Sequence, residues 1–204
     1  GALAMARISV GPMGPIVPDL NVFNLPFMFR DDQHMEKVID GQIGDEMLKK
    51  LTDSAANLVG VCWMNAGTRN VYNSKKPIKS VADLKGLKIR MMGNPVFVDT
   101  MNSLGGNGVA MGFDQLINAM QTGVIQAAEN EAAGLEQMKF YEVGPNISLT
   151  RHAITVRPVC FSGKTFRRLP KELQDAIAKA GREAGAYGRN LESSEDQARL
   201  QRLE

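Results

Sequence analysis

Short apolar runs of strand type alternate with capped helical patterns, and this alternation constrains the fold more than any other feature of the chain. The runs lie at 58–63, 68–72, 87–92 and 124–127. Among the helical patterns, Asp31 or Asp32 can cap a helix that ends near Asp40, and Asn94 followed by Pro95 is a strong helix start. Strands that alternate with helices indicate an α/β architecture with largely parallel sheets.

The last part of the chain predicts one long helix that begins near Pro170. If it is unbroken to Glu204, this helix would span roughly 50 Å at about 1.5 Å per residue. Gly181, Gly185 and Gly188 interrupt its pattern, which indicates a bend or close packing. The chain opens without methionine and stops inside a helical pattern. We therefore expect a fragment cut at both ends, from which a signal peptide would be missing.

The charge pattern and the short motifs exclude several classes of function. The 24 basic and 22 acidic residues give a net charge of +2 and are scattered, so no nucleic-acid-binding stripe is expected. Neither the two histidines nor the two cysteines have metal-ligand spacing, and no nucleotide-binding loop or catalytic motif is present, so we expect no cofactor. Cys62 and Cys160 are expected to be buried thiols within strands, with a disulfide between them as the alternative.

Arg90 is the residue that most suggests a binding site. It lies near the C-terminal end of a predicted strand, just before the helix that Asn94 caps. Ligands of open α/β sheets bind outside the carboxyl ends of the strands, and a guanidinium matches a carboxylate with two parallel hydrogen bonds. Spacing alone nevertheless favours a structural salt bridge for Arg90, with a ligand anchor as the alternative.

The other candidates are weaker when they are taken one by one. Arg69 follows a predicted loop at 65–68, and by itself it favours a structural or surface role. Asn130 could donate its amide to a ligand, although a helix N-cap is the simpler interpretation. Phe113 and Trp63 are expected in the apolar core on pattern alone.

Several stretches of the sequence carry a family resemblance. KGLKIR at 85–90, MQTGVIQAAEN at 120–130 and KFYEV at 139–143 occur in this order, together with LPF at 25–27 and GTR at 67–69. In this combination they resemble the solute-binding proteins of TRAP (tripartite ATP-independent periplasmic) transporters, the DctP type. The resemblance covers essentially the whole chain.

The resemblance implies a two-lobed α/β fold of the periplasmic-binding-protein kind, with hinge strands and a long C-terminal helix. Residues 1–66 would form part of lobe I and residues 67–154 lobe II. Residues 155–204 would return to lobe I and include a long helix that spans the hinge. The elements that open and close the family's fold would be missing from this fragment.

The resemblance also makes Arg90 the expected partner of a ligand carboxylate, and it assigns supporting roles to other residues. Arg69 and Asn130 would assist Arg90, and Phe113 would pack near the ligand. The loop at 7–12 would line the cleft, while Arg157 could add a second cation or have a structural role. The full set of expected ligand-binding residues is Arg90, Arg69, Asn130, Phe113, Trp63, Asn65, Ser9 and Arg157.

The function implied by the resemblance is capture of a small organic acid without chemistry, so we do not expect an enzyme. The receptor would be periplasmic and monomeric, and it would deliver its ligand to a TRAP membrane permease. A sugar acid such as a uronate or aldonate is the first expectation, a C4-dicarboxylate the second and a 2-oxo acid the third. Two other classes stay open: an α/β enzyme with His152 or Glu129 as base, and a ligand-sensing module of a signalling protein.

Overall fold

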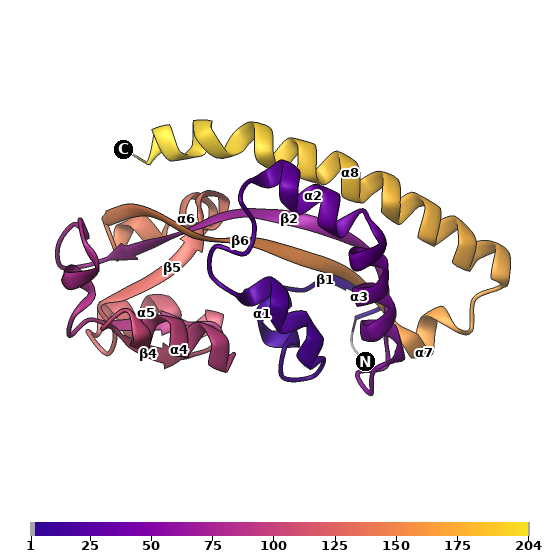
Figure 1. Cartoon of the computed structure of the whole chain (residues 1–204), viewed down its shortest axis with the longest axis horizontal. Coiled ribbons are helices and arrows are strands. Elements are labelled where there is room, and N and C mark those ends of the chain that lie inside the picture. The colour runs from indigo at the N-terminus through magenta and orange to yellow at the C-terminus, as the bar shows by residue number, and fades with distance from the viewer. Residues whose placement is uncertain (1–2, 204) are drawn as a thin grey trace.

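A six-stranded sheet forms the centre of the molecule (Figure 1). The computed structural model describes residues 3–203. Within this range the strands stand in the order β1-β6-β2-β5-β3-β4. Their bounds are Met5–Arg7 (β1), Leu58–Asn73 (β2), Lys88–Met91 (β3), Asn107–Ala110 (β4), Ala127–Glu131 (β5) and Asn146–Ser162 (β6).

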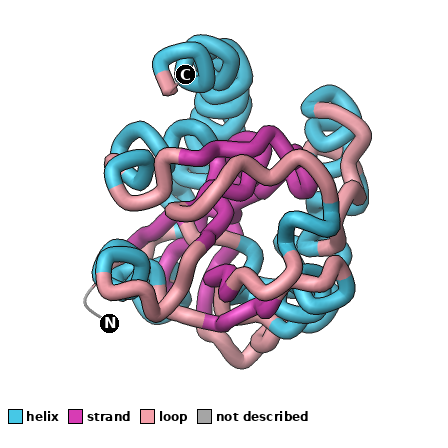
Figure 2. Tube along the Cα trace, turned by 90° about the vertical axis from the view of Figure 1, so that its left-hand side faces the viewer, coloured by secondary structure: helices cyan, strands magenta, loops and turns pink. Residues whose placement is uncertain are grey.

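Helices surround this sheet, as the end-on view of Figure 2 shows. The α-helices are Val10–Met13 (α1), Asp32–Ile39 (α2), Gln42–Asp53 (α3), Pro95–Ser103 (α4), Leu116–Gln121 (α5), Ala132–Gln137 (α6), Gly163–Phe166 (α7) and Lys171–Arg202 (α8). Short 3₁₀ segments occupy Pro18–Asn24 (η1), Val81–Leu84 (η2), Phe113–Gln115 (η3) and Phe140–Glu142 (η4). No helix in the described part of the chain has both the length and the apolar character needed to cross a membrane.

Two predicted helix starts are confirmed by their hydrogen bonds. The carboxylate of Asp31 accepts from the backbone N–H of His34 at 2.7 Å, at the start of α2. The side-chain oxygen of Asn94 accepts from the backbone N–H of Val96 at 2.9 Å, at the start of α4. In each case the cap satisfies one of the free N–H groups that a helix leaves at its first turn.

The strands β2 and β6 are the longest in the sheet. The predicted runs at 58–63 and 68–72 join into the 16 residues of β2, and β6 has 17 residues. A register shift between Asn65 and Thr68 replaces the predicted loop, with Gly67 at a φ of +95°. At about 3.3 Å per residue these strands are each about 55 Å long and run along the whole molecule (Figure 1).

The prediction of a largely parallel sheet is wrong. The pairs β1–β6, β6–β2 and β2–β5 are antiparallel, and only β5–β3 and β3–β4 are parallel. The parallel pairs are the ones that helices α4 and α5 connect, whereas β2 and β6 pair along their length as a ribbon. The predicted strand at 124–127 is shifted as well, because β5 begins at Ala127.

The buried apolar residues form separate clusters along the two long strands. One cluster contains residues of α1 to α3 together with Trp63, Val156 and Cys160. Two others contain residues between 71 and 140, from β3, β5, α4 and α5 among other elements. Both predicted lobe boundaries, at 66/67 and 154/155, fall inside continuous strands, and the division into lobes stays a prediction.

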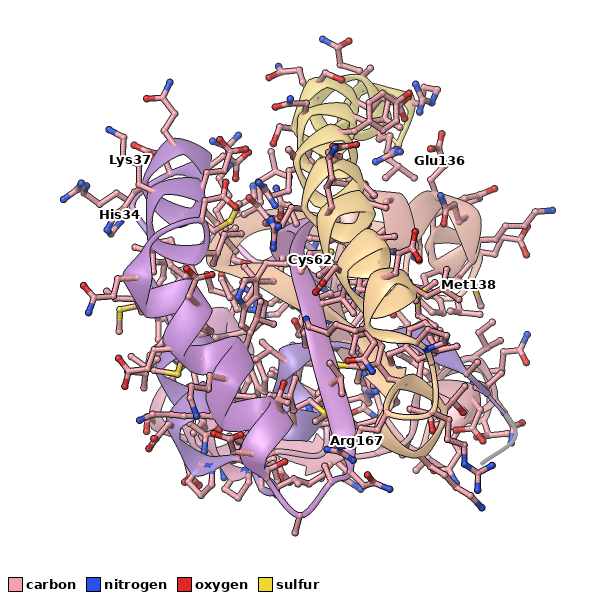
Figure 3. All side chains as sticks on the ribbon, turned by 90° about the vertical axis from the view of Figure 1, so that its right-hand side faces the viewer. His34, Lys37, Cys62, Glu136, Met138 and Arg167 are labelled. Carbon is pink, nitrogen blue, oxygen red and sulfur yellow. The ribbon has the colours of Figure 1, made fainter. Side chains whose placement is uncertain are left out.

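The helix α8 is continuous, and it packs along β2 (Figure 1). Its glycines permit this contact, because a Cβ on Gly185 would lie 2.8 Å from the carbonyl oxygen of Trp63. Close packing therefore accounts for glycine at position 185. Cys62 lies on β2 between α8 and the α2–α3 pair (Figure 3). Cys62 and Cys160 are buried free thiols within strands, as predicted.

Candidate functional site

A cavity of about 590 Å³ lies at the carboxyl end of β3 and reaches the strands β1 and β6. Six of the eight predicted site residues line it: Ser9, Arg69, Arg90, Phe113, Asn130 and Arg157. The rest of the lining is Arg7, Pro12, Met92, Gly93, Ala110, Met111 and Gly112. The fold thus collects residues that are more than 140 positions apart in the sequence, although whether they bind a ligand stays a prediction.

Arg90 enters this cavity with its terminal nitrogens free. Its side chain is buried, with 4% of the residue exposed, and its Nε donates to the carbonyl oxygen of Met111 at 2.9 Å. Neither terminal nitrogen forms a hydrogen bond or ion pair with any residue from 3 to 203. Burial lowers the pKa of Arg90, because the charged form loses hydration. A buried guanidinium without a carboxylate partner is costly unless a ligand completes it.

Phe113 and Ser9 lie at the same cavity as Arg90. The guanidinium carbon of Arg90 lies 5.9 Å from the centroid of the Phe113 ring, at the limit of a cation–π contact. The Phe113 ring in turn packs edge-on against Phe140 at 5.5 Å. The hydroxyl of Ser9 donates to the sulfur of Met92 at 3.3 Å. Both side chains therefore lie where the sequence predicted them, and their contact with a ligand stays a prediction.

Arg69 lines the cavity, but all five of its N–H groups already have protein partners. Its Nε and one terminal nitrogen donate to the carboxylate of Glu129, and the same terminal nitrogen donates to the Glu129 carbonyl at 2.8 Å. The other terminal nitrogen donates to Glu131 and, at 3.3 Å, to Asn130. A guanidinium has five donors, so Arg69 has none left for a ligand. In this structure Arg69 instead holds three consecutive residues of β5.

Glu129 is the buried counter-ion of Arg69. Burial opposes its ionisation, yet Arg69 and His152 outweigh burial and lower its pKa to about 2. Its carboxylate lies 3.5 Å from Nε2 of His152, whose Nδ1 is 2.9 Å from the hydroxyl of Thr150. Glu129 and His152 do not line the cavity at Arg90.

Asn130 is one of the residues that line the cavity. Its side-chain oxygen accepts from Arg69 and from the backbone N–H of Glu131, at 3.3 and 3.0 Å. These two bonds orient the amide and leave its nitrogen without a partner among the described residues. A Cβ on Gly134 would lie 2.7 Å from that nitrogen. Glycine at position 134 is therefore needed for the observed orientation of Asn130.

Arg157 shares the carboxylate of Glu131 with Arg69. One terminal nitrogen of Arg157 donates to Glu131, while its Nε is buried without a partner. Burial lowers the pKa of Arg157, and Glu131 opposes this effect. Arg157 therefore combines a structural ion pair with a position at the cavity.

The structure places two predicted site residues away from the cavity, which corrects their expected positions. Trp63 is 2% exposed and packs edge-on against Phe23 at 5.4 Å, and its indole N–H donates to the carbonyl oxygen of Gly44 at 3.0 Å. Asn65 is 2% exposed and accepts from the backbone N–H of Gly67 at 2.7 Å. Trp63 belongs to the core, as its pattern alone indicated, and Asn65 stabilises the irregular stretch of β2.

The sequence analysis did not predict two partners of the arginines at this site, namely Glu131 and the carbonyl oxygen of Met111. Glu129 and Glu131 stand two residues apart in β5, whose sequence is AAENE. Residues two apart in a strand point to the same face, so this spacing could have indicated a buried pair of counter-ions. The sequence could not indicate the role of the Met111 carbonyl, because every residue has a backbone carbonyl oxygen.

Asn94 and Gly11 directly neighbour two lining residues, Gly93 and Pro12, and they form a polar contact with each other. Nδ2 of Asn94 donates to the carbonyl oxygen of Gly11 at 2.7 Å and to Oδ1 of Asn21 at 2.8 Å. Asn94 is 1% exposed. These bonds connect the start of α4, in predicted lobe II, to α1 and η1, in predicted lobe I.

Comparison with known proteins shows similarity over the whole chain. The family model described as bacterial extracellular solute-binding protein, family 7, matches residues 1–204. A solute-binding protein of Sulfitobacter sp. (strain NAS-14.1) is 44% identical over 195 residues, which are 94% of this chain and 57% of that protein. The chain spans 57–60% of the length of such curated relatives.

Solved structures match the fold closely. A TRAP periplasmic solute-binding protein from Pseudomonas putida F1, with bound D-glucuronate, has a TM-score of 0.95 and 46% identity; the match covers all of this chain and 66% of that one. A protein from Citrobacter koseri is 39% identical, with all of this chain matched to 67–68% of that chain. Its TM-score is 0.94 with bound D-glucuronate and 0.84 in the open, apo form. The structure is thus nearer to the ligand-bound arrangement.

The family model matches the whole chain, and the solved structures match its fold. The chain belongs to the bacterial extracellular solute-binding proteins of family 7, the DctP family.

Proposed function

We propose that this protein is a periplasmic receptor that binds a sugar acid, with a hexuronate as the first choice, and releases it unchanged. The observation that carries the proposal is the buried guanidinium of Arg90, whose terminal nitrogens have no partner among residues 3–203 and face a cavity. A planar carboxylate fits these two nitrogens with parallel, charge-assisted hydrogen bonds. A charge-assisted bond contributes about 1.5–3 kcal/mol.

The hydroxyl groups of a sugar acid have suitable partners around Arg90. The free amide N–H groups of Asn130 can donate to ring or hydroxyl oxygens, and the Ser9 hydroxyl can exchange its weak bond to the Met92 sulfur for a bond to the ligand. Phe113 offers an apolar face on the same side. D-glucuronate, the ligand of the Pseudomonas putida protein, supplies both a carboxylate and these hydroxyls.

The alternative ligands have weaker support. A C4-dicarboxylate could not use Arg69 for its second carboxylate, because the donors of Arg69 are all occupied, and it offers few hydroxyl groups to Asn130 and Ser9. A 2-oxo acid would leave the amide of Asn130 and the hydroxyl of Ser9 with little to bind.

An enzymatic role has no support from the geometry at this cavity. The bases that it would require, His152 and Glu129, are buried outside the lining. Capture by closure of two lobes around the ligand is the mechanism that we propose. Delivery to a TRAP membrane permease and a monomeric state are part of the same proposal.

Calorimetry with D-glucuronate tests the role of Arg90. We expect Arg90→Gln to weaken binding at least tenfold, because the carboxylate loses its charged partner, and tenfold corresponds to about 1.4 kcal/mol. Arg168→Gln is the matched control: Arg168 is exposed and its side chain makes no hydrogen bond within the described range. Equal affinity in wild type and Arg90→Gln would refute the role of Arg90. Chemical conversion of recovered ligand would refute the proposal of a receptor.

A further inference from the structure

The cavity at Arg90 is unusually rich in positive charge. Four arginines line it, Arg7, Arg69, Arg90 and Arg157, and its lining contains no aspartate or glutamate. They come from four strands, β1, β2, β3 and β6. A single carboxylate ligand needs only one of them.

The internal counter-ions neutralise two of these four charges. Glu129 pairs with Arg69, and Glu131 is shared between Arg69 and Arg157. These two glutamates are 0% and 3% exposed, so they are fixed parts of the structure. Four positive and two negative charges leave a surplus of two at the cavity. Arg90 carries one of them, and the other belongs to Arg7 and Arg157.

Arg7 is exposed and Arg157 is half-buried, and neither has a full set of partners among the described residues. The side chain of Arg7 forms no hydrogen bond or ion pair with a residue that the structure describes. Arg157 has one bond, to Glu131, and its Nε is buried without an acceptor. The positive charges of Arg7 and Arg69 also lower the pKa of Arg157, as expected for guanidinium groups that lie near one another.

Arg7 and Arg157 come from strands that are not adjacent to the strand of Arg90. In the sheet order, β2 and β5 separate β6 from β3, and β1 lies beyond β6. Three strand intervals correspond to about 14 Å between the backbones of β6 and β3. Side chains that extend inward from both sides leave room for a ligand with one acidic group at each end.

We propose that Arg7 and Arg157 form a second anion subsite, so that the cavity accepts open-chain sugar diacids in addition to sugar acids with one carboxylate. This inference rests on the proposed function, because Arg90 must hold the first carboxylate. The second carboxylate lies between Arg7 and Arg157, and the hydroxyls between the two ends meet Asn130 and Ser9. Both carboxylates are then paired, and the surplus of two positive charges is neutralised.

Calorimetry on the full chain with D-glucarate and D-glucuronate tests this subsite. At low ionic strength we expect D-glucarate to bind at least tenfold more tightly than D-glucuronate. We expect Arg7→Gln to bring the two affinities within about threefold of each other, with D-glucuronate binding little changed. Arg7 is the better position to vary, because Arg157 also supports Glu131.

The outcomes separate the two proposals. Equal binding of the two acids by the wild type, or an unchanged preference in Arg7→Gln, would overturn the second subsite and leave the sugar-acid receptor intact. If neither acid binds, the proposed function fails, and the subsite fails with it. Arg168→Gln again serves as control and should keep the wild-type preference.

Discussion

Nδ2 of Asn94 lies 2.8 Å from Oδ1 of Asn21, and this hydrogen bond joins the start of α4 to η1. The same nitrogen donates its second hydrogen to the carbonyl oxygen of Gly11. The Asn94 side chain is buried and uses its oxygen to cap α4. One side chain thus ties a helix of predicted lobe II to predicted lobe I next to the cavity.

We expect this contact to stabilise the closed arrangement and to slow ligand release. Asn21→Ala removes the acceptor, and one lost hydrogen bond costs about 0.5–1.5 kcal/mol. The dissociation rate of D-glucuronate should therefore rise about two- to tenfold, as measured by stopped-flow displacement, with little change in the association rate. Asn118→Ala, on the exposed face of α5, is the control and should leave both rates unchanged.

Gly14→Ala offers an independent test of the same contact. The backbone of Gly14 is helical and accepts alanine, but a Cβ there would overlap the side chains of Asn21 and Asn94. We expect this single methyl group to speed ligand release at least as much as Asn21→Ala. Wild-type release rates in both variants would show that the contact does not control closure.

Gly134→Ala should weaken ligand binding although position 134 is outside the cavity lining. The added Cβ would lie 2.7 Å from Nδ2 and 2.8 Å from Cγ of Asn130, so the amide must move. We expect a three- to tenfold loss of affinity for D-glucuronate by calorimetry. Because alanine favours a helix over glycine by about 1 kcal/mol, the melting temperature should fall little. Unchanged affinity would mean that the amide of Asn130 does not contact the ligand.

Two glycines of α8 should respond in opposite ways to the same substitution. A Cβ on Gly185 would lie 2.8 Å from the Trp63 carbonyl oxygen, so Gly185→Ala should destabilise the fold by about 1–3 kcal/mol. A Cβ on Gly188 would lie 3.6 Å from the terminal carbon of Met64, an ordinary contact. Gly188→Ala should therefore stabilise by about 0.5–1 kcal/mol. Urea unfolding measures both, and effects of the same sign would contradict the packing of α8 on β2.

Acid should weaken the fold through Glu129. Its pKa is about 2 in the folded protein against an ordinary value of 4.5, so the unfolded chain takes up the proton first as the pH falls. The stabilisation by Glu129 is complete above about pH 4.5 and is lost as the pH approaches 2. In Glu129→Gln, urea unfolding should give lower stability at pH 7 and a weaker dependence on pH in that interval.

The control for this pH dependence is Glu183→Gln, which alters an exposed glutamate of α8 that forms no ion pair within residues 3–203. It should keep the wild-type profile. A Glu129→Gln profile parallel to the wild type between pH 4.5 and 2 would contradict the ion pair with Arg69.

The helix starts were predictable because each depends on neighbours in the sequence. Asp31 and Asn94 cap bonds that form within two or three residues, and their patterns were sufficient to place α2 and α4. The position of Arg90 at the end of a strand, just before a capped helix, was visible for the same reason. The lack of a counter-ion for Arg90 among residues 3–203 was not predictable, because spacing alone favoured a salt bridge.

The pairing of the long strands could not be predicted in this way. Each half of β2 has the length and pattern of a separate short strand, and the chain between them contains Gly67, which usually marks a turn. Pairing with β6 on both sides of this stretch keeps the strand continuous, and the Asn65 side chain accepts from the Gly67 N–H within it. The paired residues of β6 lie about 100 residues away in the sequence, and local propensity does not report on such contacts.

The sequence by itself determined the alternation of strands and helices, the caps, the long C-terminal helix and the motifs that identify the family. Tertiary structure decided which arginine is free. Arg69 and Arg90 are equally able to hold a carboxylate, but β5 places Glu129 and Glu131 against Arg69 and none against Arg90. The physical reason is that Arg90 is buried away from water and has no carboxylate partner among residues 3–203, and both conditions depend on residues distant in the chain.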